Sequence, residues 1–141
     1  MTANSEHAVL QRRHLRIGWG SLCVFVALGG VLEAMHGLKV DWYLAVGNET
    51  QRLLWRLAHA HGTFLSLVHI GFAVTLPYMV AARPQLASAS FTCALIALPG
   101  GFLLGAFGGN SGDPGLGILL VPVGLVMLLV AIISTLRCLR S

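Results

Sequence analysis

Residues 116–136 of the chain read LGILLVPVGLVMLLVAIISTL and include no charged side chain. A helix needs about 20 mostly apolar residues to cross the roughly 30 Å of hydrocarbon in a bilayer. This stretch meets the requirement, and so do residues 17–35, 58–79 and 88–107. The sequence therefore predicts an all-α integral membrane protein, built as an antiparallel bundle of four transmembrane helices.

The composition agrees with this fold class. Of the 141 residues, 56% are apolar and only 10% are charged, whereas soluble domains are about a quarter charged. We expect a single domain over residues 1–141, with residues 1–15 as a polar N-terminal tail. The formal net charge of +4 indicates membrane orientation and attraction to anionic headgroups, so no nucleic-acid partner is expected.

Basic residues predict the orientation, because cytoplasmic segments of membrane proteins carry an excess of Lys and Arg. An even number of spans places both termini on one side. If that side is the inner one, six basic residues lie inside and three outside. The inner set is Arg12, Arg13, Arg16, Arg83, Arg137 and Arg140, and the outer set is Lys39, Arg52 and Arg56. We therefore expect both termini inside, in a bacterial inner (cytoplasmic) membrane.

Ionisable side chains gather near the outer ends of the first two spans. At about 100° per residue, Glu33 and His36 lie within about 60° of each other on one helix face. His59 and His61 begin the second span at a similar height but about 200° apart, so one of them faces elsewhere. Helical bundles build metal sites from imidazole and carboxylate groups on facing helices. These four residues are therefore candidate ligands for a b-type haem or for a copper, iron or zinc ion.

Each of these residues also has a structural interpretation. Glu33 can pair with Arg56, and the ring of His59 can simply meet the lipid headgroups. His69 lies about 12 Å deeper than His61, at mid-membrane depth. For these two histidines the alternative role is interhelical hydrogen bonding, which contributes about 0.6 kcal/mol on average in membranes.

One stretch, AHAHGTFLSLVHIGFAVTLP at residues 58–77, resembles the haem-ligating helix of haem-copper oxidase subunit I. The matching positions are His61, Gly62, Thr63 and Pro77. The proline follows later than in that family, the match covers one helix of four, and the copper-ligating helices are absent. The resemblance implies only that His61 would be the preferred ligand of a haem.

Two further patterns concern helix packing and helix starts. Gly101, Gly105 and Gly109 recur at every fourth residue and leave a smooth stripe on which another helix can pack closely. Asn48, followed three residues later by Gln51 in NETQ, is a capping-box pattern that predicts a helix start well before the second span.

Three functions from different classes fit the sequence. The first is a non-catalytic or accessory subunit, or an organiser, of a membrane complex, with membrane-protein partners or copies of itself in the lipid bilayer. The second is an intramembrane haem or metal redox protein that uses Glu33, His36 and His59 or His61. The third is a small proton-coupled transporter that uses His69. An enzymatic activity would require a bound cofactor, because the sequence contains no catalytic motif.

Overall fold

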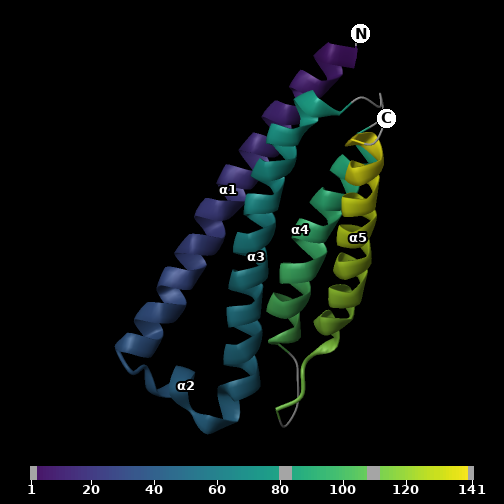
Figure 1. Ribbon diagram of the computed structural model, residues 1–141. Coiled ribbons are helices and arrows are strands. Elements are labelled where there is room, and N and C mark those ends of the chain that lie inside the picture. Colours follow the sequence, from purple (N-terminus) through teal and green to yellow (C-terminus); the bar gives the residue numbers. More distant parts are fainter. Residues whose placement is uncertain (1–2, 80–83, 108–111, 140–141) are drawn as a thin grey trace.

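The computed structural model describes residues 3–79, 84–107 and 112–139, and every regular element in these ranges is helical. Four long helices run antiparallel in chain order (Figure 1). They are α1 (Ala3–Gly37), α3 (Glu49–Thr75), α4 (Gln85–Gly105) and α5 (Leu120–Leu139). The short elements are α2 (Asp41–Leu44) and the 3-10 turns η1 (Val46–Asn48), η2 (Leu76–Tyr78) and η3 (Leu116–Leu119). Together with their flanking turns, four helices in the described part are long and apolar enough to cross a membrane, as the sequence predicts.

The four helices form an open row in which each packs on its predecessor in the chain (Figure 1). No comparable packing joins α1 to α5 in the described residues. In consequence 61% of the most apolar stretch of α4 is buried, against 11% in each of the outer helices α1 and α5. The expectation of a four-helix bundle thus needs refinement, because the outer helices leave the row unclosed.

Helix α1 begins at Ala3. This start lies within residues 1–15, for which the sequence suggested a polar tail. Its first turns contain no Gly or Pro to interrupt a helix, and Glu6 in the first turn interacts favourably with the helix dipole. His14, within the supposed tail, is fully buried. Within this segment, His14 and the partly buried Leu10 therefore pack in the protein core.

Helix α1 ends in a Schellman motif with an unusual residue. The N–H of Val40 donates to the carbonyl of Met35 at 3.0 Å, and the N–H of Lys39 donates to that of His36 at 3.1 Å. The motif requires a left-handed residue, usually Gly, and here Lys39 occupies that position with φ 52°. A residue with a Cβ atom is strained in this left-handed conformation, so Lys39 makes the turn less stable than Gly would.

Helix α3 begins at Glu49, the start predicted by the capping-box pattern, although Asn48 makes no side-chain cap bond. Its Nδ2 instead donates to the carbonyl of Trp42 at 2.6 Å. From the first turn of α3, Arg52 Nη1 donates to the carbonyl of Tyr43 at 2.5 Å. These two bonds attach α2 to the beginning of α3.

The predicted glycine stripe lies where α4 meets η3 and α5. A Cβ added at Gly101 would lie 2.9 Å from the backbone nitrogen of Val121, and one at Gly105 would lie 3.2 Å from that of Ile118. Gly109 lies outside the described residues. A side chain at Gly101 would push the backbones apart, and one at Gly105 would make a tight contact with Ile118.

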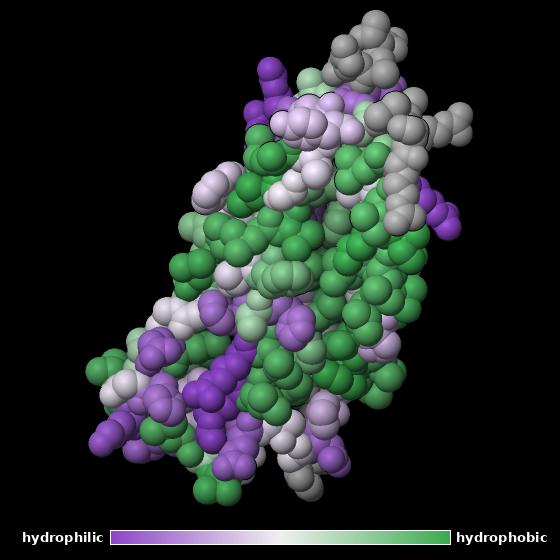
Figure 2. Space-filling model, viewed as in Figure 1, coloured by the Kyte–Doolittle hydropathy of each residue, from purple (hydrophilic) through white to green (hydrophobic). Residues whose placement is uncertain are grey.

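Apolar residues cover the middle of the helices on the face shown in Figure 2, and hydrophilic residues gather mainly toward the end that contains α2. Many large apolar side chains are exposed, among them Leu116 at 86% and Ile96 at 69%. Four apolar spans and an apolar outer surface together suggest an integral membrane protein.

Candidate functional site

A cavity of about 280 Å³ lies between α1 and α3 toward the α2 end. It brings together three of the four predicted ligands, Glu33 and His36 from α1 and His59 from α3. Arg56, one turn before His59, also lines it. Gly29 allows the ring of His59 to lie against α1, since a Cβ there would overlap that ring.

The polar groups of this cavity make few contacts with one another. Arg56 donates through Nη2 to His36 Nδ1 at 3.5 Å, and His59 donates through Nδ1 to the carbonyl of Phe25 at 2.7 Å. Within residues 3–79, 84–107 and 112–139, neither Glu33 nor Arg56 forms an ion pair. The cavity therefore presents both a carboxylate and a guanidinium group at the surface.

His61 lies apart from this cavity, in keeping with its separation of about 200° from His59. Its Nδ1 donates to the carbonyl of Leu57 in its own helix at 2.8 Å, and its ring centroid is 5.0 Å from that of Phe102 in α4. It lines a second, largely apolar cavity of about 340 Å³ with Leu98 and Leu125. The histidine favoured by the oxidase resemblance thus faces away from Glu33 and His36.

The haem or metal interpretation finds no support in this geometry. His59 and His61 both donate through Nδ1 to carbonyls, as metal-binding histidines commonly do, but they line separate cavities. In the described part of the chain, no group of three or more His, Cys, Asp or Glu side chains converges closely enough to hold an ion.

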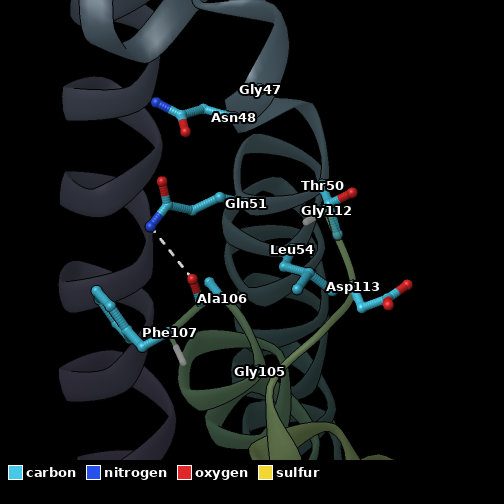
Figure 3. A pocket seen from close by; sticks show the side chains of 10 residues that line it. All are labelled: Gly47, Asn48, Thr50, Gln51, Leu54, Gly105, Ala106, Phe107, Gly112 and Asp113. Carbon is cyan, nitrogen blue, oxygen red and sulfur yellow. Dashed lines mark hydrogen bonds between the residues drawn. The ribbon is translucent and has the colours of Figure 1, made fainter. Parts of the chain in front are cut away.

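A third cavity, of about 200 Å³, lies where the beginning of α3 meets the end of α4 (Figure 3). Gln51 bridges the two helices by donating from Nε2 to the carbonyl of Ala106 at 3.1 Å. Asp113 lines this cavity beside Thr50, so its carboxylate belongs to a different part of the surface from Glu33.

The sequence singled out His69, with interhelical hydrogen bonding as one of its roles, but not its partner His14 in the most deeply buried polar cluster of the described residues. His14 of α1 and His69 of α3 are both fully buried, and their Nδ1 atoms are 2.8 Å apart. His14 Nε2 is 2.7 Å from the hydroxyl oxygen of Ser88 in α4, and His69 Nε2 is 3.1 Å from the carbonyl oxygen of Phe91. The cluster therefore joins three helices through polar contacts.

A periodic signal in the sequence could have revealed this cluster. His7, His14 and Ser21 recur at intervals of seven residues, which places them on one face of a helix. Ser21 also meets a polar partner on α3, because the hydroxyl of Ser66 donates to it at 2.7 Å. The signal was overlooked because His7 and His14 were assigned to a tail.

No protein-family model, curated protein or solved structure matches the chain. Its function has to be inferred from its own residues.

Proposed function

We propose that this chain is a non-catalytic subunit of a membrane complex, and that it associates with a second copy of itself through the outer face of α1. One observation carries the proposal, a row of six small residues spaced alternately by three and four positions. This row, the α1 outer face, consists of Gly20, Cys23, Ala27, Gly30, Ala34 and Gly37.

All six residues are exposed. A Cβ added at Gly20, Gly30 or Gly37 would meet no other atom within 4 Å. On the opposite side of α1, Gly18 and Gly29 lie against residues of α3. The α1 outer face is therefore open to another helix.

The spacing and the residue types both favour a helix as the partner. Intervals of three and four residues keep one face of a helix turned toward its neighbour in a left-handed pair. Small residues let two backbones approach closely, and van der Waals contacts then hold them together within lipid. The large side chains beside the row, Trp19 at 61% and Val24 at 63% exposure, would pack around such a contact.

A second copy suits this face because all six residues are uncharged and similar in size. Two identical faces related by a two-fold axis along the membrane normal place each small residue near its counterpart. In a membrane such an axis requires both copies to have the same orientation. We propose that both termini lie on the cytoplasmic side of a bacterial inner membrane, because arginines are in excess near the end of the protein that contains the termini. A C-terminal reporter that is active only in the cytoplasm tests this orientation.

The native Cys23 provides a direct test of association. A variant with Cys93→Ser and Cys138→Ser retains only Cys23, and mild oxidation in native membranes should produce a disulfide-linked dimer. The control retains only Cys93, which is exposed on α4 outside the proposed face and should remain monomeric under the same conditions.

Bulky substitutions sharpen this test. Gly30→Leu adds a side chain to the open α1 outer face and should abolish the Cys23 cross-link. Gly71→Leu is the matched control, because Gly71 on α3 is also exposed and has open space around it. Absence of a Cys23 dimer, or identical cross-linking of the Gly30 and Gly71 variants, contradicts the proposal.

A further inference from the structure

The hydrogen bonds around the buried histidines fix the position of each proton. The carbonyl of Phe91 can only accept, so His69 Nε2 carries a hydrogen and donates it. A neutral His69 then has a bare Nδ1, which must accept from Nδ1–H of His14. A neutral His14 in turn has a bare Nε2, which accepts from the hydroxyl of Ser88. When both rings are neutral, one arrangement satisfies every ring nitrogen.

The geometry points to this cluster as a binding site for a single proton, whose positive charge the two rings share. The incoming proton binds to His14 Nε2, which changes from acceptor to donor and now donates to the hydroxyl oxygen of Ser88. The Ser88 hydroxyl hydrogen then turns away from Nε2 while its oxygen accepts. Every ring nitrogen remains hydrogen bonded after this change.

The positive charge can then move from α1 to α3. The hydrogen between the two Nδ1 atoms, which are 2.8 Å apart, shifts from His14 to His69 and leaves His14 neutral. A second proton has no place, because both Nδ1 atoms would then carry hydrogens directed at each other. The pair therefore binds one proton and excludes another.

The proton enters and leaves on the side of His14. Beyond His69 the hydrogen-bond chain ends at the carbonyl of Phe91, which has no hydrogen to pass on. On the other side, His7 lies seven residues before His14 and within about 20° on the same face of α1. Its Nε2 is buried and has no hydrogen-bond partner among the described residues. Among the described residues the hydrogen-bond chain continues from the pair only through Ser88, so we place proton exchange on the His14 side.

Other titratable groups surround this end of the protein, but in the described residues none is hydrogen bonded to the pair. Glu6, the carboxylate at this end of α1, accepts a hydrogen bond from Gln85 at 3.2 Å instead. The remaining groups are Arg12, Arg13 and Arg16 on α1, Tyr78 in η2, Cys93 on α4, and Arg137 and Cys138 on α5. The added charge is therefore shared by the two rings alone.

Nitrogen NMR of the full chain in lipid nanodiscs, with ¹⁵N-labelled histidine, tests this site. At about pH 8, where free imidazole is neutral, we expect a nitrogen–nitrogen coupling through the hydrogen bond between one pair of rings. His14→Gln and His69→Gln should each abolish it. His61→Gln is the matched control and should preserve it, because the ring of His61 bonds only to its own helix.

Acidification to about pH 4, well below the ordinary pKa of imidazole, tests the capacity of the site. The coupled pair should gain one proton in total, with the ¹⁵N signals of both rings changing together. At pH 8, Ser88→Ala should shift the signal of His14 Nε2 most, because the neutral ring then loses the hydroxyl that donates to this atom. Absence of the coupling in the wild-type protein, or uptake of one proton by each ring, overturns the inference. Because the wild-type spectrum decides both points, a variant that fails to fold leaves the test intact.

Discussion

Two glycines of α1 provide a sharp test of the contact between α1 and α3. Gly18 is buried, and a Cβ added there would lie 2.9 Å from the carbonyl oxygen of Ser66 and 3.1 Å from the backbone nitrogen of Ile70. Gly20, two residues further on, is exposed and would meet nothing within 4 Å. We predict that Gly18→Ala destabilises the protein relative to Gly20→Ala.

The difference in stability between the Gly18 and Gly20 variants isolates the effect of the contact between α1 and α3. Replacing Gly by Ala within a helix contributes up to about 1 kcal/mol of favourable backbone entropy, and this gain is common to both variants. The atoms that crowd Gly18 include backbone atoms of α3, which cannot rotate away, so α1 must move outward. Such overpacking costs about 1–3 kcal/mol. We therefore expect Gly18→Ala to be less stable than Gly20→Ala by about that amount.

Unfolding in mixed micelles of a mild detergent and dodecyl sulfate, followed by far-ultraviolet circular dichroism, measures this difference. The two variants should be compared at a protein concentration at which both have the same oligomeric state, because Gly20 belongs to the α1 outer face. Equal stabilities, or a more stable Gly18 variant, would refute the close approach of α1 to α3.

Three further substitutions test the loops and the end contacts by the same unfolding measurement. Lys39→Gly removes the left-handed strain after α1 and should raise stability by about 1 kcal/mol; a loss would show that the lysine side chain stabilises this turn. Gln51→Leu deletes the bond to the carbonyl of Ala106 and should cost about 1 kcal/mol, whereas an unchanged stability would count against that bond. Arg52→Met removes a charged donor from the carbonyl of Tyr43 and should cost about 1–2 kcal/mol, with faster proteolysis of the α2 segment as a second readout.

Hydropathy predicted which segments form the long helices, because each apolar run is long enough to span a bilayer and contains few breaks. The capping-box pattern also located the beginning of α3 at Glu49. Both signals depend on residues that are close together in the sequence, and such signals predict individual helices well. Hydropathy does not predict how the helices are arranged in space, because lipid and the protein interior are similarly apolar.

Close contacts between helix backbones determine this arrangement, and each contact depends on one or a few residues. Gly18 and Gly29 let α1 approach α3, and Gly124 of α5 would place a Cβ 2.7 Å from the backbone nitrogen of Leu98 in α4. Arginines flank His14 on both sides, a pattern that favours a polar tail. The buried pair with His69 depends on a helix that continues beyond the apolar stretch, which hydropathy alone does not reveal.

The open row also has a consequence for biosynthesis. Because each long helix packs on its predecessor, the main tertiary contacts join helices that follow each other in the chain. Chains emerge N-terminus first, so the hairpin of α1 and α3 can form while α4 is still being synthesised. His14 and His69 then meet before α4 arrives, and their contacts with Ser88 and Phe91 form only after α4 has been added. The assembly of the buried pair would therefore follow the order of translation.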